Sequence, residues 1–244
     1  IECTAFLNPF ISNTTAANYV FGTALDLVGP GDLTKSGNVL AIGAPGNNNL
    51  PTGGYVSVYE WDTSTSNWEI RQQIAPSTVT GGKFGRALSL SQNGVFLAVG
   101  AFELDVSDGL GGSYHSAGQV RTYIYSESSG NYIDFGKKHS FQSGYGLDGP
   151  DSSAYFGRSV DIVSDTTFDI TRDDPEVTRL SLAVGGTGSP SSLYIMGNTG
   201  TFTSNESRYI SMSNDTSFNT NLIDNSNKYA EKISVNLEKK NSII

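Results

Sequence analysis

Residues 21–27 read Phe-Gly-Thr-Ala-Leu-Asp-Leu, and the chain repeats this stretch twice. Residues 84–90 read Phe-Gly-Arg-Ala-Leu-Ser-Leu, and residues 156–162 read Phe-Gly-Arg-Ser-Val-Asp-Ile. After each Phe-Gly pair come a variable residue, a small residue and then apolar residues at alternate positions. A period of two residues is typical of a half-buried strand. The repeat therefore predicts three strands that begin three equivalent structural units.

A second motif follows each copy of the first. Residues 40–45 read Leu-Ala-Ile-Gly-Ala-Pro, residues 97–102 read Leu-Ala-Val-Gly-Ala-Phe, and residues 182–187 read Leu-Ala-Val-Gly-Gly-Thr. These short apolar runs predict buried strands that end at a glycine. The gap between the two motifs is longest in the third unit, and gaps of variable length between fixed strands are typical of loops.

A third match predicts a hairpin in the first two units. Residues 55–68 align without a gap to residues 119–132, with a Ser, Gly and Asn-rich turn at the centre of each. Two alternating strands around such a turn indicate a β-hairpin. Each unit then holds four strands, and successive units start about 60 to 70 residues apart, as four-stranded propeller blades with long loops do. We therefore expect an all-β fold.

The pairing of a Phe-Gly strand with a later Gly-Ala-Pro resembles the FG-GAP repeat of integrin α-subunit heads and other surface proteins. The resemblance implies a β-propeller of four-stranded antiparallel blades, with three clear blades and a partial fourth. Gly-Ala-Pro is intact in the first repeat only. The expected organisation is a lead-in at 1–18, blades at 19–81, 82–153 and 154–216, and a degenerate partial blade or tail at 217–244.

In proteins of this family the Phe-Gly and Gly-Ala-Pro corners pack together as a cage beside each blade, so the resemblance implies a structural role for both motifs. Glycine permits the tight turns and close backbone approach that such a corner needs, and Phe supplies an apolar plug. The implied cage residues are Phe21, Gly22, Gly43, Ala44, Pro45, Phe84, Gly85, Gly100, Ala101, Phe156, Gly157, Gly185 and Gly186.

Three units and a stub do not comfortably close a ring, because propellers have four to eight blades. Open sheet edges would leave backbone groups unpaired. We therefore expect further blades from the same or another chain, or a large assembly that covers the edges. Residues 218–222 and 233–236 faintly repeat the two motifs, so 217–244 is either a degenerate blade or an Asn- and Ser-rich tail.

Composition excludes several functions. The net charge of −9 disfavours nucleic acid and anionic lipid, and the sequence holds no apolar run long enough for a membrane-spanning helix. It also lacks the common zinc, nucleophile and phosphate-loop motifs, and its single Cys3 and two histidines, His115 and His139, are too few for a zinc site. We expect a protein that is not an enzyme.

Acidic loops raise the question of calcium, which hard oxygen ligands at alternating positions would bind. The weak candidates are Asp105, Asp108, Asp165 and Asp169, none of them in the spacing of a calcium loop. Solvated acidic loops are the simpler interpretation, so we expect no cofactor, with calcium as the alternative. Three sequons, at Asn13, Asn205 and Asn214, are candidates for N-glycosylation.

Two classes of function remain at this stage. The first is a non-catalytic interaction or adhesion module on an extracellular, cell or virion surface, which binds protein or glycan partners through the loops 102–118 and 163–178. Its variant is a structural subunit of a virion, a filament or another large assembly. The second class is a propeller-type hydrolase, which would need acids or histidines at equivalent positions of the blades.

Overall fold

The fold is known from a computed structural model, which describes residues 20–29, 38–46, 53–76, 81–107, 110–135, 146–164, 179–187, 192–197 and 210–211. Every regular element in these segments is a β-strand, which confirms the prediction of an all-β protein. Within the same segments no helix has the length and apolarity to span a membrane. The possible fourth unit at 217–244 lies outside the described residues.

Two antiparallel sheets have four strands each, hydrogen-bonded in the order of the chain. Sheet 1 consists of β1 (Ala24–Val28), β2 (Val39–Ala44), β3 (Tyr55–Asp62) and β4 (Asn67–Ile74). Sheet 3 consists of β12 (Ser159–Ser164), β13 (Arg179–Gly185), β14 (Ser192–Gly197) and β15 (Ile210–Ser211). The first strand of each sheet begins two residues after the glycine of its Phe-Gly pair, and the second strand contains the apolar run with its glycine.

Sheet 2 lies between them in the sequence and has a fifth strand that the repeat did not predict. Its four repeat strands are β5 (Ala87–Leu90), β6 (Phe96–Ala101), β9 (Gln119–Ser126) and β10 (Asn131–Phe135). The short β11 (Leu147–Asp148) adds to β9 at Val120 and Gln119. A separate pair, β7 (Val106–Ser107) and β8 (Ser113–Tyr114), stands in the loop between β6 and β9.

The predicted hairpins of sheets 1 and 2 are present, and their registers match each other. Trp61 pairs with Trp68, and Tyr125 pairs with Tyr132 at the equivalent position. The ring centroids of each pair lie 5.6 Å apart. Aromatic pairs at this spacing stabilise a hairpin beyond the area they bury. The gap-free alignment of residues 55–68 with 119–132 is therefore a true structural equivalence.

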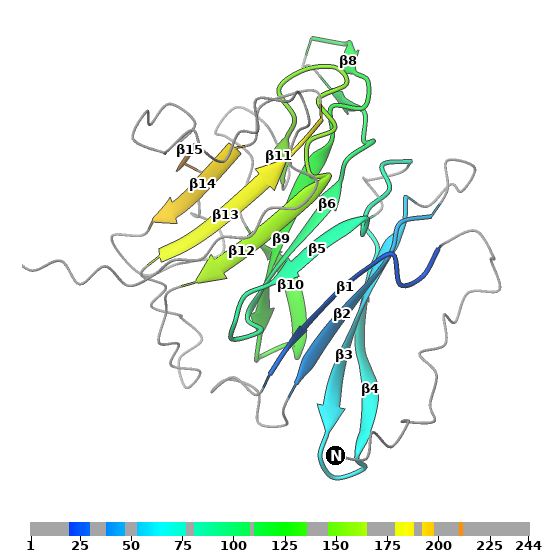
Figure 1. Cartoon of the computed structure of the whole chain (residues 1–244), viewed down its shortest axis with the longest axis vertical. Coiled ribbons are helices and arrows are strands. Elements are labelled where there is room, and N and C mark those ends of the chain that lie inside the picture. The colour runs from blue at the N-terminus through cyan, green and yellow to red at the C-terminus, as the bar shows by residue number, and fades with distance from the viewer. Residues whose placement is uncertain are drawn as a thin grey trace, which may run out of the picture.

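The three sheets pack face to face, and their first strands β1, β5 and β12 lie side by side (Figure 1). Sheet 2 is apolar on both faces because it packs against both neighbours. The core between sheets 1 and 2 includes Val39, Ala41, Val56, Val58, Leu88, Leu90, Leu97 and Val99. The core between sheets 2 and 3 includes Phe96, Ala98, Val120, Ile124, Phe135, Val160, Ile162, Leu182 and Val184.

Polar groups join the outer strands of sheets 1 and 2. The Gln72 side chain donates to the Tyr132 carbonyl at 3.0 Å and accepts from the Tyr132 amide at 2.7 Å, as a backbone partner would. Arg71 pairs with Glu60 and stacks over the Tyr125 ring, with its Cζ 4.5 Å from the ring centroid. Burial raises the pKa of Tyr132 well above its usual range, so its hydroxyl stays a neutral donor to the Gly94 carbonyl.

Candidate functional site

The glycines of the two repeated motifs meet within each sheet. The amide of the Phe-Gly glycine donates a hydrogen bond to the carbonyl of the glycine that ends the second strand. The N···O distances are 3.0 Å from Gly22 to Gly43, 3.0 Å from Gly85 to Gly100 and 3.1 Å from Gly157 to Gly185. Phe84 and Phe156 are fully buried beside these bonds, whereas Phe21 is only half-buried.

The same glycines also meet between neighbouring sheets. A Cβ on Gly43 would lie 1.9 Å from the carbonyl oxygen of Gly85, and a Cβ on Gly100 would lie 1.9 Å from that of Gly157. No side chain fits at such distances, so the two backbones touch directly. The amide of the neighbouring Phe84 also donates to the Gly53 carbonyl at 2.7 Å, across the same junction. The Phe-Gly corners of sheets 2 and 3 are thus packed directly against the sheet that precedes each of them.

The departures from Gly-Ala-Pro have local causes. Ala44 and Ala101 are buried at the middle position, but a Cβ on the equivalent Gly186 would lie 2.4 Å from the Ala154 carbonyl oxygen. At the third position Pro45 is buried, and in its place Phe102 packs against Tyr155 with ring centroids 6.2 Å apart.

Two further junction features escaped the sequence analysis. The residue before each Phe-Gly has a positive φ, at 49° for Val20, 54° for Lys83 and 49° for Tyr155. This left-handed conformation is unusual for side chains of these types. The three residues share no chemical property, so the sequence offers no signal for the turn. Each of the three carbonyls accepts a hydrogen bond from the residue three positions later, which closes the turn.

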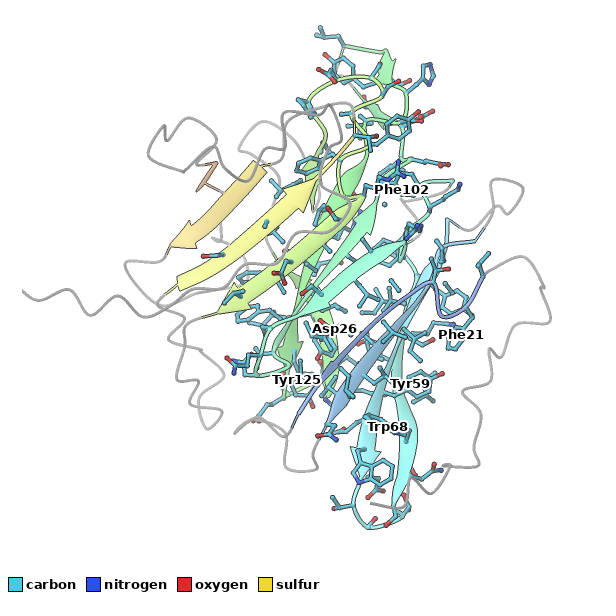
Figure 2. The ribbon with its side chains drawn as sticks, viewed as in Figure 1. Phe21, Asp26, Tyr59, Trp68, Phe102 and Tyr125 are labelled. Carbon is cyan, nitrogen blue, oxygen red and sulfur yellow. The ribbon has the colours of Figure 1, made fainter. Side chains whose placement is uncertain are left out.

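The second feature is a polar residue in the middle of each first strand. Asp26 Oδ2 accepts a hydrogen bond from the Leu90 amide of the next sheet at 2.7 Å, and Asp26 lies at this junction in Figure 2. Ser89 Oγ likewise accepts from the Ile162 amide at 3.3 Å. Asp161 occupies the same position in sheet 3. A polar residue at one fixed position of three apolar strands was the available signal for this bond.

The loop 102–118 extends from the end of sheet 2 and carries β7 and β8 at the top of Figure 1. Its base is fixed, because the Leu104 amide donates to the Ala101 carbonyl at 3.1 Å and the Gly118 amide to the Leu104 carbonyl at 2.9 Å. Leu104 and Val106 are buried. Toward the tip, Leu110 is 93% exposed and Tyr114 is 40% exposed.

The loop is also tied to the segment that leads into sheet 3. Its last residues accept backbone hydrogen bonds from that segment. The Ser153 amide donates to the His115 carbonyl at 2.8 Å, the Tyr155 amide to the Ser116 carbonyl at 3.0 Å, and the Phe156 amide to the Ala117 carbonyl at 2.9 Å. A loop held on both sides presents its tip with little loss of backbone entropy on binding. The arrangement suits a contact surface.

Phe102, labelled in Figure 2, lies among charged groups at the root of this loop. Lys83 Nζ is 5.7 Å and Arg158 Cζ is 5.9 Å from the centroid of its ring. Lys83 also forms an ion pair with Glu103 at 2.9 Å. Cations over an aromatic face stabilise its position, so this cluster braces the loop rather than offering reactive groups.

The one predicted acidic candidate that the structure describes is Asp105, which lies in this loop. Its carboxylate accepts from the Ser116 amide at 2.8 Å and lies 3.1 Å from His115 Nδ1. The Ser116 amide and, next, His115 hold the pKa of Asp105 below its usual range. Among the described residues, no three His, Cys, Asp or Glu side chains gather as a metal site requires. The Asp105–His115 pair is an exposed structural contact.

Several candidates lie outside the described residues. They are the acidic residues Asp108, Asp165 and Asp169, the sequon residues Asn13, Asn205 and Asn214, and Cys3 and His139. The turn at 91–94 is described, and its polar groups bond to one another. The Asn93 side-chain oxygen accepts from Ser91 Oγ at 2.6 Å and from the Val95 amide at 3.2 Å.

Comparison of the chain with models of known protein families and with curated proteins found no match.

Proposed function

We propose that this chain is part of an FG-GAP-type β-propeller and acts as a non-catalytic interaction module on a cell or particle surface. Three consecutive antiparallel sheets with adjacent first strands support the propeller arrangement. The recurrence of the same glycine contact at both sheet junctions supports it further, since it implies one repeated relation between neighbouring sheets.

The observation that carries the binding role is the loop 102–118. It combines a base anchored on two sides with an exposed aliphatic and an exposed aromatic side chain at Leu110 and Tyr114. Tyr is a common anchor in binding surfaces, because it offers a large contact area at a low entropic cost. The partner class we propose is a protein or a glycan, bound without a metal ion.

The test compares a loop variant with a matched surface variant. We expect the double substitution Leu110→Ser and Tyr114→Ser to weaken binding to cell surfaces and to immobilised glycans at least about tenfold. Ile133→Ser on β10 is the control, because Ile133 is 39% exposed and lies outside the loop. Equal binding by the two variants, or turnover of a glycan or phosphoester by the wild-type protein, would overturn the proposal.

Calcium provides an independent check. We expect calorimetric titration with calcium to detect no tight site in the loops at 28–38 or 91–94. The hydrogen bonds among Ser91, Asn93 and Val95 already use the side-chain oxygens of the second loop. Heat that disappears on substitution of Asn93→Ala would contradict this expectation.

A structural subunit of a large assembly is the second candidate. The observation that favours it is the exposure of Leu25 and Leu27 on sheet 1, at 66% and 54%. Apolar side chains that face water in a row are typical of surfaces that a partner covers. A protein with this role would associate with itself or with neighbouring subunits, and its loops would carry no partner of their own.

A further inference from the structure

The lysine and arginine side chains that the structure describes differ in whether they have an anionic partner. Three have a carboxylate partner, namely Arg71 with Glu60, Lys83 with Glu103 and Arg121 with Asp134. Among the described residues, Arg86 and Arg158 have none. Arg86 is exposed and solvated by water, whereas Arg158 is half-buried. A cation that is partly withdrawn from water without a bound anion is costly, so an anion from outside would stabilise it.

Arg158 lies at the root of the loop 102–118, between the two ends of this loop. Its Cζ is 5.9 Å from the ring centroid of Phe102, the first residue of the loop, which Figure 2 labels. The Tyr155 amide, three residues before Arg158, donates to the carbonyl of Ser116 near the other end of the loop. The Tyr155 ring also packs against Phe102. A partner that covers the loop therefore comes close to Arg158.

The contact with Phe102 restrains the Arg158 guanidinium without using its hydrogen-bond donors. Among the described residues, none accepts a hydrogen bond from this guanidinium. An arginine held over an aromatic ring keeps its N–H groups free, and two of them match the two oxygens of a carboxylate. The Arg158 amide donates to the Gly185 carbonyl at 3.0 Å, which fixes the backbone below. Little entropy is then lost when a carboxylate binds.

The charges around the loop root leave Arg158 uncompensated. Lys83 faces the same Phe102 ring, with its Nζ 5.7 Å from the centroid, but Glu103 neutralises it at 2.9 Å. Asp105 already accepts from the Ser116 amide and pairs with His115. Arg158 therefore keeps a local positive charge, although the chain has a net charge of −9. Such a charge favours an anionic group at this point of the surface.

We propose that Arg158 binds a carboxylate of a protein partner, from an Asp or a Glu side chain, while Leu110 and Tyr114 contact apolar groups of the same partner. Leu110 is 93% exposed and gains from contact with apolar groups, which protein side chains supply and hydroxylated sugar rings largely lack. Arg and Tyr are also enriched among the residues that carry the binding energy of protein interfaces. The inference rests on the binding role proposed for the loop, and it adds the chemistry of the partner.

Displayed random peptides, selected on the immobilised wild-type protein, provide the probe. We expect the selected peptides to share an Asp or a Glu, and one of them is then synthesised and titrated calorimetrically against each variant. Arg158→Gln should raise its dissociation constant at least about tenfold. Arg158→Lys should restore only part of the affinity, because an ammonium group lacks the fork of the guanidinium. Arg86→Gln is the matched control and should change nothing, since Arg86 is exposed and occupies the same position in the preceding Phe-Gly repeat.

A change on the peptide keeps the test valid if Arg158→Gln disturbs the fold. A peptide with Gln or Asn in place of its acidic residue should bind the wild-type protein about as weakly as the original peptide binds Arg158→Gln. The two changes together should weaken binding no further, because they remove the same contact. Fully additive losses would mean that the carboxylate contacts another group, and would overturn the assignment of Arg158.

Further outcomes separate this inference from the proposed function. Peptides that bind through Leu110 and Tyr114 but carry no acidic residue would overturn the role of Arg158 and leave the proposed function intact. Peptides that need Arg158 but bind equally well after Leu110→Ser and Tyr114→Ser would reject the proposed function of the loop, and with it the shared surface. Binding of sialyllactose by the wild-type protein, with no acidic peptide selected, would overturn the protein partner in favour of an acidic glycan.

Discussion

The first strands of sheets 1 and 2 have nearly the same sequence and opposite surroundings. Leu88 and Leu90 on β5 are buried against sheet 1, whereas Leu25 and Leu27 on β1 are largely exposed. Gly85 touches the preceding sheet, and Gly22 faces open space among the described residues. The difference teaches that the repeat encodes a junction and not only a strand. Whether the equivalent residues of a sheet are buried or exposed depends on whether another sheet packs against them.

The largest effect should come from a side chain placed inside a filled junction. We expect Gly43→Ala to cost at least about 3 kcal/mol of unfolding free energy, because its Cβ would overlap the Gly85 carbonyl and force two sheets apart. Gly22→Ala should cost only about 1–2 kcal/mol, from its positive φ of 87° alone. Urea denaturation of dilute protein measures both. Equal losses of unfolding free energy would mean that Gly43 and Gly22 have equally crowded surroundings.

Truncation of the equivalent leucines should separate the two strands next. Leu90→Ala removes a buried side chain and should lower the unfolding free energy by about 2–5 kcal/mol. Leu27→Ala should change the stability of the dilute chain by no more than about 0.5 kcal/mol, since Leu27 is 54% exposed. Thermal and urea unfolding of the two variants check this. A large loss for Leu27→Ala in the dilute chain would show that its surroundings resemble those of Leu90.

The hydrogen bond from the Leu90 amide to Asp26 should have a smaller effect. We expect Asp26→Ala to cost about 1–3 kcal/mol, because the substitution leaves an amide at the junction without its acceptor. Asp26→Asn keeps an acceptor oxygen and should recover most of the loss. Hydrogen exchange at the Leu90 amide, compared with Ile162 as an internal reference, provides the local measurement. If the Leu90 amide is equally protected from hydrogen exchange in Asp26→Ala, the hydrogen bond to Asp26 does not stabilise the junction.

The smallest effect should come from the strained turn before Phe21. Val20 is a β-branched residue with a φ of 49° and is 60% exposed. We expect Val20→Asn to stabilise the chain by about 1 kcal/mol, because Asn tolerates this conformation better. At the equivalent position of sheet 2, Lys83→Asn should not stabilise, since it also removes the ion pair with Glu103. Melting temperatures of the two variants that shift in the same upward direction would contradict this expectation.

Sequence reasoning predicted the strands well where the repeat supplied independent copies. The alternating pattern and the gap-free hairpin alignment predicted the repeat strands of sheets 1 and 2 and the hairpin that closes each unit, whereas the pairing of Trp61 with Trp68 came from the structure. Strand β11 was not predicted, because a pairing of two residues leaves no periodic pattern. The left-handed turns at Val20, Lys83 and Tyr155 were missed for a similar reason, since unrelated side chains occupy them.

The candidate binding loop, residues 102–118, was likewise predicted in part, and its long-range contacts were not. The sequence indicated that 102–118 is a loop and that Asp105 lies in it, but not that Asp105 accepts from Ser116 or that the base is anchored through Leu104 and Gly118. These contacts join residues that are distant in the chain, and local patterns do not encode such distances. For the hydrogen bond between Asp26 and the next sheet, the sequence offered only one signal, which is the polar residue that recurs at this position of each first strand.

The sequence by itself determined the repeat strands of sheets 1 and 2 and the two glycines of each unit, because these follow from local alternation and from repetition. Only the tertiary structure decided which glycines touch across a junction, how the loop 102–118 is held, and that Leu25 and Leu27 face outward. The physical reason is that an apolar residue at a fixed position in a strand has the same intrinsic preference in every repeat, whereas its burial depends on the neighbour that packs against it.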